Sequence, residues 1–270
     1  MTRASTRVWY RIAVARPDEP AALYAAEGEH LGAAVAAAVN HIKGAYAISA
    51  EVATGDQIPL GESVGKHQVV ALGELAMASA FRWPIGVLPQ IGHDISGRRG
   101  FVIHPDRELL VIEARTDAEH VTDLFLGLIE RLPAADNLEI RVLDHFENAG
   151  TTDVWLTSRV DAKKILRFLD DHDELIENGH LELSIYVRKH NATLRLTEHK
   201  AVVWLAKDDA LRAEVEGWLG ELDVPRVEPL VRVEAVPHLH YRPAKSRDRA
   251  KLAEHLYRQR LRRVDKLVRE

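Results

Sequence analysis

The sequence predicts an α+β protein in which mixed or antiparallel sheets carry helices mainly on one face. After residue 100, short segments of alternating apolar and polar residues recur, as in strands that are buried on one side. Capped amphipathic segments separate them and predict helices. Charge is the third observation: residues 242–270 hold 11 Lys and Arg against four Asp and Glu, whereas the whole chain carries −5. A basic C-terminal helix is therefore expected to follow an acidic body.

The first element is a strand at residues 8–15, and an alanine-rich helix follows at 20–43. Gly28 and Gly32 lie four residues apart in this helix, and small residues at that spacing let another element pack closely. A strand at 46–52 comes next.

A second helix is predicted at residues 66–81. Residues 83–100 contain two prolines and four glycines, which predicts a long loop. We place the end of an N-terminal α/β region, residues 1–100, in this loop.

The elements after residue 100 are predicted in the order β-α-β-β-α-β, followed by β-β-α-β. Residues 116–119 form a capping-box pattern that opens a helix. The predicted strands lie at residues 109–114, 138–146, 153–159, 181–189, 192–198, 200–206 and 227–241, and the helices at 116–132, 161–178 and 208–220. The first six elements follow the ferredoxin-like order. We therefore predict a ferredoxin-like α+β region at 101–241 and a basic amphipathic helix at 242–270.

Composition excludes several classes of protein. The 270 residues are 46% hydrophobic and 29% charged, which is typical of a folded globular chain. The absence of cysteine excludes disulfides, thiolate metal sites and a cysteine nucleophile. The N-terminus lacks the apolar segment of a signal peptide, so we expect a cytoplasmic protein with no membrane partner.

The basic C-terminal segment, residues 242–270, is the main candidate site, and we call it the tail. Its predicted nucleic-acid-binding residues are Arg242, Lys245, Arg247, Arg249, Lys251, Arg258, Arg260, Arg262, Arg263 and Lys266. Apolar residues recur along the same segment at helical spacing, which leaves three interpretations open. The helix docks on its own acidic body, pairs with a second copy of the chain, or lies along a phosphate backbone.

A polar sheet face is a second candidate. Alternation places Tyr186, Arg188 and Arg195 on strand faces opposite the predicted core. Aromatic and arginine side chains on an open sheet can stack on bases and pair with phosphates. Solvation, or burial against residues 1–100, is the alternative explanation.

An acidic cluster at Asp170, Asp171, Asp173 and Glu174 is predicted on one helix. Spacings of three and four residues place Asp170, Asp173 and Glu174 on one face. Such a cluster is expected either to be solvated or to contact a basic protein partner.

His238 and His240 form the best candidate for a metal site, and no other cofactor is expected. Residues two apart on a strand share a face, so both imidazoles could reach one divalent ion. A third ligand would have to come from His180, His190 or His199.

The leading hypothesis is a non-enzymatic nucleic-acid-binding protein that uses the tail and the polar sheet face. The alternative is a protein–protein interaction module, such as an inhibitor, adaptor or immunity-type protein, with an acidic surface. A metal-dependent hydrolase or nuclease is the third. Nucleotide-binding, serine-hydrolase and zinc-protease signatures are missing from the sequence.

Overall fold

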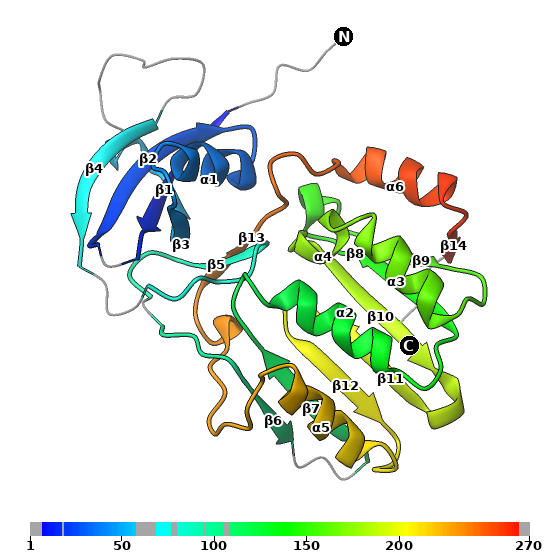
Figure 1. Ribbon diagram of the computed structural model, residues 1–270. Coiled ribbons are helices and arrows are strands. Elements are labelled where there is room, and N and C mark those ends of the chain that lie inside the picture. Colours follow the sequence, from blue (N-terminus) through cyan, green and yellow to red (C-terminus); the bar gives the residue numbers. More distant parts are fainter. Residues whose placement is uncertain are drawn as a thin grey trace. The chain divides into compact units, whose positions relative to one another are not determined.

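The computed structural model describes residues 7–17, 19–57, 69–76, 80–93, 95–104 and 108–264 (Figure 1). The chain divides into two compact units. Unit 1 comprises Met1–Gly97 and Val231–Lys245, and unit 2 comprises Arg98–Leu230 and Ser246–Glu270. The fold is mixed α+β, and every strand ladder described is antiparallel.

The described residues of unit 1 form a four-stranded sheet in the order β3-β1-β2-β4, one α-helix and a separate two-stranded ladder of β5 and β13. Its elements are β1 (Val8–Ala15), β2 (Ala21–Gly28), α1 (Leu31–Asn40), β3 (Tyr46–Val52), β4 (Val69–Leu75), β5 (Val87–Pro89) and β13 (His238–His240). The strands predicted at 8–15 and 46–52 are confirmed as β1 and β3.

The long helix predicted at residues 20–43 is wrong in its first half. Residues 21–28 form β2, which pairs with β1 on one side and β4 on the other. Alanine favours a helix locally, but a central position between two strands satisfies the backbone groups of β2 and overrides that preference. The helix α1 begins only at Leu31.

At Gly32, another segment packs closely on the helix, as the small size of glycine predicted. A Cβ atom at this position would lie 1.8 Å from the carbonyl oxygen of Arg242. The segment containing Arg242 therefore packs directly on the backbone of α1, within unit 1.

Two further predictions for unit 1 need correction. The described part of the helix predicted at 66–81 is the strand β4, which pairs with β2. The strand predicted at 227–241 shortens to β13, and its partner β5 lies inside the loop predicted at 83–100. Pairing between distant segments, which local patterns do not show, decides both cases.

Unit 2 contains an eight-stranded sheet in the order β14-β9-β8-β10-β11-β12-β7-β6. Its strands are β6 (Gly100–His104), β7 (Leu110–Arg115), β8 (Asn137–Val142), β9 (Asp153–Leu156), β10 (Leu181–Val187), β11 (Ala192–Leu196), β12 (Val202–Ala206) and β14 (Arg262–Val264). Its helices are α2 (Val121–Arg131), α3 (Ala162–Asp170), α4 (Glu174–Glu177), α5 (Arg212–Glu221) and α6 (Arg249–Arg258).

The ferredoxin-like arrangement is not confirmed. In that arrangement, one strand separates the two parallel strands that a crossover helix joins. Here α2 joins β7 to β8, and β12, β11 and β10 lie between them in the sheet. The hairpins β10–β11 and β11–β12 insert into the middle of the sheet and push β7 away from β8.

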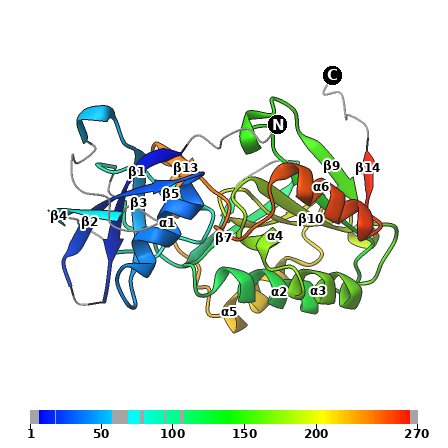
Figure 2. The same cartoon turned by 90° about the horizontal axis from the view of Figure 1, so that it is seen from above.

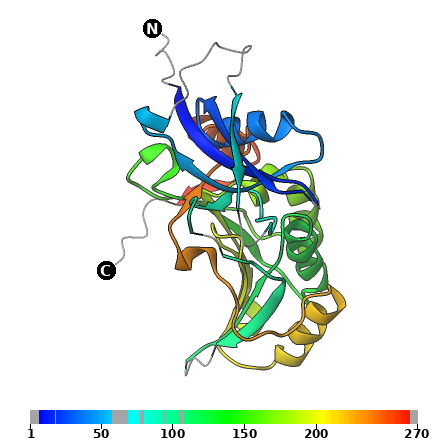
Figure 3. The same cartoon turned by 90° about the vertical axis from the view of Figure 1, so that its left-hand side faces the viewer.

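One face of the unit 2 sheet is covered by helices. Helices α5, α2 and α3 lie in a row against it (Figure 2), and the view along the sheet places these green and gold helices on a single side (Figure 3). The main apolar core fills the space between sheet and helices and includes Phe125, Ile140, Leu183 and Trp204. The opposite face carries polar side chains such as Glu139 and Arg195 together with apolar ones such as Val203 and Leu205.

The continuous basic helix predicted at 242–270 is not confirmed. Helix α6 ends at Arg258, and Arg260 takes a left-handed backbone conformation with φ of 63°. The chain then forms β14, which pairs with β9 at the sheet edge. This turn returns Leu261 to the core, where its side chain is only 3% exposed. Residues 265–270 lie outside the described part.

The helices that the structure describes include none with both the length and the apolar character needed to cross a bilayer.

Candidate nucleic-acid interface

The segment after residue 246 docks on unit 2 through its apolar side chains. Leu252, Leu256 and Leu261 are 2%, 0% and 3% exposed and belong to the main core of the unit. This is the first of the three arrangements that the sequence left open for the tail. Its basic residues therefore divide between those that hold the segment in place and those that project outward.

Arg249 is one of the residues that hold the segment in place. Its guanidinium donates to the carbonyl oxygens of Leu143 and Thr151 at 2.5 Å each and to Asp153 at 2.9 Å. The side chains of Arg249 and Asp153 are 12% and 11% exposed. Arg249 is thus committed to structure and is not available to bind a phosphate.

Two other predicted contact residues are also paired inside unit 2. Arg247 forms an ion pair with Glu174, and its backbone N–H donates to the same carboxylate at 3.2 Å. Arg263 forms an ion pair with Asp153, although its side chain stays 55% exposed.

The outward-facing residues form what we call the α6–β14 surface: Lys251, Tyr257, Arg258, Arg260 and Arg262, all exposed. Tyr257 is 74% exposed, the highest value among the large hydrophobic side chains that the structure describes. Two carboxylates accompany these cations, since Arg258 pairs with Glu254 and Lys251 lies 3.1 Å from Asp248. The surface therefore combines a solvent-facing aromatic ring with a net positive charge.

Arg159 is a neighbouring cation that the sequence reasoning did not select. Arg262 pairs with Leu156 in an antiparallel register, so the residues before Arg262 run alongside those after Leu156. The Arg159 side chain is 85% exposed and lies 3.4 Å from Asp136. It lies three residues beyond β9 and ends the strand predicted at 153–159, where alternation places it on the face of Asp153.

The remaining tail residues lie elsewhere. Arg242 and Lys245 belong to unit 1, where Arg242 packs beside Gly32 and close enough to His30 to lower its pKa. Burial is the larger cause, and together these effects bring the pKa of His30 to about 4. Lys266 lies outside the described residues.

The polar sheet face exists, but its candidate residues are partly occupied by internal contacts. The Tyr186 hydroxyl donates to Glu139 at 2.6 Å, and Arg188 donates to the side-chain oxygen of Asn137 at 3.0 Å. Burial, together with this hydrogen bond to Glu139, raises the pKa of Tyr186 to about 12. Arg195 differs from Tyr186 and Arg188, because its Nε is buried without a hydrogen-bond partner among the described residues.

Acidic side chains on the same face oppose phosphate binding. Glu139 accepts from Arg141 at 2.5 Å and is 5% exposed. Burial and a hydrogen bond with Glu198 raise the pKa of Glu182 to about 7, an effect that Arg195 and Arg141 partly offset. The arginines of this face thus sit among buried or half-buried carboxylates, whereas the carboxylates beside the α6–β14 surface, Glu254 and Asp248, form ion pairs with exposed cations.

The sequence predicted that the acidic cluster lies on one helix, and this prediction is wrong. Helix α3 ends at Asp170 and α4 begins at Glu174, so Asp170, Asp173 and Glu174 share no helical face. Carboxylates are unfavourable at a helix C-terminus, which explains a break at this point. Asp170, Asp171 and Asp173 stay exposed, while Glu174 is used by Arg247.

The two histidines proposed for a metal lie together on β13, with ring centroids 5.1 Å apart. The Nδ1 of His238 lies 2.8 Å from the carbonyl oxygen of Val236. The three residues considered for a third ligand all belong to unit 2. Metal binding at His238 and His240 stays a prediction.

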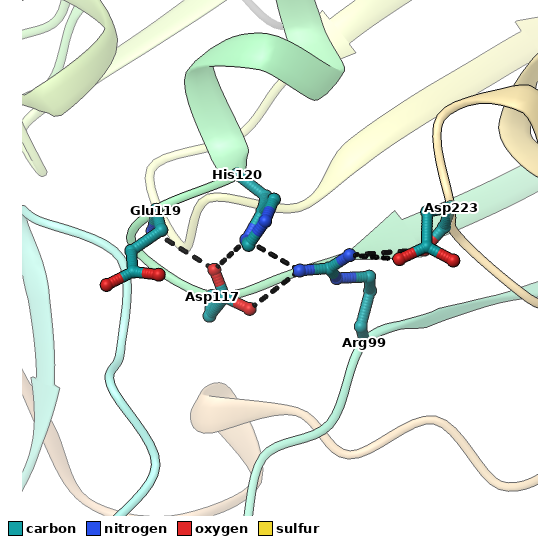
Figure 4. A network of polar contacts seen from close by, with 5 residues as sticks. All are labelled: Arg99, Asp117, Glu119, His120 and Asp223. Atoms are coloured by element: carbon teal, nitrogen blue, oxygen red, sulfur yellow. Dashed lines mark hydrogen bonds and ion pairs between the residues drawn. The ribbon is translucent and has the colours of Figure 1, made fainter. Parts of the chain in front are cut away.

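A polar network that the sequence did not reveal joins three segments of unit 2 (Figure 4). Arg99 donates to Asp117 at 3.2 Å and to Asp223 at 2.7 Å, and the His120 ring lies 2.5 Å from Asp117. Burial alone would raise the pKa of Asp117, but the bonds from His120 and Arg99 outweigh it and lower the pKa.

This network also replaces the capping box predicted at 116–119. Asp117 accepts the backbone N–H of Glu119 at 3.0 Å, and α2 starts later, at Val121. Through Arg99, the network connects the segment before α2 to the segment after α5. We assign it a structural role.

Comparison with known proteins yields no match to this chain among protein-family models, curated protein sequences or solved structures.

Proposed function

We propose that this protein binds single-stranded nucleic acid through the α6–β14 surface. The observation that carries the proposal is the exposed Tyr257 ring on a short segment whose exposed cations are Lys251, Arg258, Arg260 and Arg262. A base can stack on an aromatic ring, whatever its identity, while neighbouring cations neutralise the phosphates. Duplex DNA keeps its bases stacked on one another, so an exposed tyrosine favours single strands.

The way the tail docks supports this proposal. Its leucines face the core, so they hold the segment firmly on unit 2 and orient the remaining side chains toward solvent. A nucleic acid would then meet a fixed surface and would not have to order a flexible helix, which lowers the entropic cost of binding.

The acidic body sets the expected strength of binding. The chain carries a formal charge of −5, so long-range repulsion opposes association. Binding is therefore expected to be local, modest in affinity and strongly dependent on salt.

The test measures fluorescence anisotropy of labelled DNA and RNA single strands of about 20 nucleotides, and of duplexes, across a salt series. Tyr257→Ala is expected to weaken single-strand binding about tenfold, the loss of one stacking contact. Neutralising Lys251, Arg260 and Arg262 to glutamine should lower the slope of log K against log salt by about 2.

The matched control neutralises three exposed cations elsewhere on unit 2, namely Lys189, Lys207 and Arg226. This control should leave both affinity and salt slope close to those of the wild type. An equal loss in the control would show non-specific attraction, and no binding at low salt would refute the proposal.

A further inference from the structure

A groove runs between helices α2 and α3, on the face of unit 2 that the helices form. Its volume is about 490 Å³, and its lining residues are Asp123, Leu126, Gly127, Glu130, Leu166, Arg167 and Asp170. Figures 1 and 2 show the two helices side by side. We call it the α2–α3 groove.

The floor of the groove is apolar. Leu126 and Leu166 are half-buried and pack against the main core with part of their surface, which leaves the rest facing the groove. On α2, the lining positions 123, 126, 127 and 130 follow one helical stripe. A third helix packs onto such a pair through side chains with the same spacing.

The rim of the groove is negatively charged. Asp123 and Glu130 on α2 and Asp170 at the end of α3 are exposed carboxylates, and Arg167 is the one cation among the lining residues. Asp171 and Asp173 are exposed just beyond Asp170 and extend the negative charge. An apolar floor with an acidic rim complements a helix that has one apolar face and flanking lysines or arginines.

We propose that the α2–α3 groove binds a basic amphipathic helix of a protein partner. This site is separate from the α6–β14 surface and does not depend on nucleic-acid binding. Its charge repels phosphates, so the two surfaces are expected to select different ligands. Asp170 is the one member of the predicted acidic cluster that lines the groove.

The test uses a labelled peptide of about 16 leucines and lysines, with leucines at helical spacing, and a scrambled peptide of identical composition. The protein is expected to bind the patterned peptide at least about tenfold more tightly than the scrambled one. The triple variant Asp123→Asn, Glu130→Gln, Asp170→Asn should lose about tenfold in affinity for the patterned peptide.

The matched control removes the same number of exposed carboxylates elsewhere, through Glu74→Gln, Asp209→Asn and Glu214→Gln. This control should bind the patterned peptide within about twofold of the wild type. Circular dichroism checks that each variant folds, and single-strand binding by the triple variant should be unchanged, which separates the two proposals.

Three results would overturn the proposal. Equal binding of the patterned and scrambled peptides would reduce the interaction to general charge attraction. Equal losses in the triple variant and its control would place the peptide elsewhere. A wild-type dimer that the triple variant converts to monomer, measured by sedimentation, would assign the groove to a second copy of this chain.

Discussion

At the scale of the residue, Lys200 is a buried lysine whose contacts cannot be predicted from the residues next to it in sequence. It is 1% exposed, and its Nζ donates to the carbonyl oxygens of Ile176 and Asn178 at 2.7 Å each. These carbonyls lie at the C-terminal end of α4, so the amine caps that helix. Burial lowers the pKa of Lys200 to about 7, although Glu198 and Glu177 act in the opposite direction.

The lowered pKa predicts that stability rises with pH above 7. The unfolded chain then binds more protons than the folded one, because its lysine keeps the usual pKa of about 10.4. The neutral amine still donates two hydrogen bonds, so both carbonyls stay satisfied. Between pH 7 and 9, wild-type stability should increase by about 1–3 kcal/mol relative to Lys200→Met.

Urea denaturation at several pH values measures this difference. At pH 9, Lys200→Met should be less stable than the wild type by about 1–3 kcal/mol or more, because two buried carbonyls lose their donors. A variant with the same pH dependence as the wild type would show that Lys200 keeps its ordinary pKa.

At the scale of the element, helix α6 places the ring of His255 against that of His172 in unit 2. The rings of His255 and His172 lie 4.7 Å apart, and Nε2 of His255 is buried without a hydrogen-bond partner among the described residues. Burial, followed by the charges of Arg247, His172 and Arg258, lowers the pKa of His255 to about 4.

Acidification is therefore expected to destabilise the docking of α6. As pH falls from about 6.5 to 4, the unfolded chain gains a proton at this position and the folded chain does not. His255→Leu should keep its stability at pH 7 and lose less than the wild type on acidification. His30 titrates in the same pH range, and Glu182 changes the stability in the opposite direction. Both residues are present in the wild type and in His255→Leu, so the difference between these two proteins reports His255.

Hydrogen exchange of α6 amides, measured at pH 7 and pH 5, reports the docking directly. The wild-type protection should fall at pH 5, and that of His255→Leu should fall less. Equal changes in both chains would exclude His255 as the cause.

The same element shows where sequence patterns fail. Leu252 and Leu256 have helical spacing and both lie in α6, but the helix begins only after Asp248, whose side chain accepts the N–H of Lys251 at 2.8 Å. The pattern continues beyond Arg258, yet the chain turns at Arg260 because β9 offers an edge strand for pairing. Periodicity reports a buried face but not the partner that buries it.

At the scale of the whole molecule, the chain passes between the two units three times. The segment Val231–Lys245 returns to unit 1, and the segment from Ser246 completes the core of unit 2. The C-terminal segment is thus part of the fold and not an appendage.

Truncation after residue 241 should therefore destabilise unit 2. It removes Leu252, Leu256 and Leu261 from the core, at roughly 1.5–3 kcal/mol for each buried leucine. The expected result is a urea midpoint well below that of the full chain. A chain that ends at residue 264 keeps these leucines and serves as the control, and equal midpoints for both would contradict the docking.

By itself, the sequence determined the α+β class, the strands β1, β3, β10, β11 and β12, and the segregation of basic residues near the C-terminus. These features depend on alternation and composition, which are properties of neighbouring residues. Only the tertiary structure decided that residues 21–28 are a strand, that β7 and β8 lie apart, and which tail cations face solvent. Each depends on which distant segment covers a given face, because the free energy of burial is gained only when that contact forms.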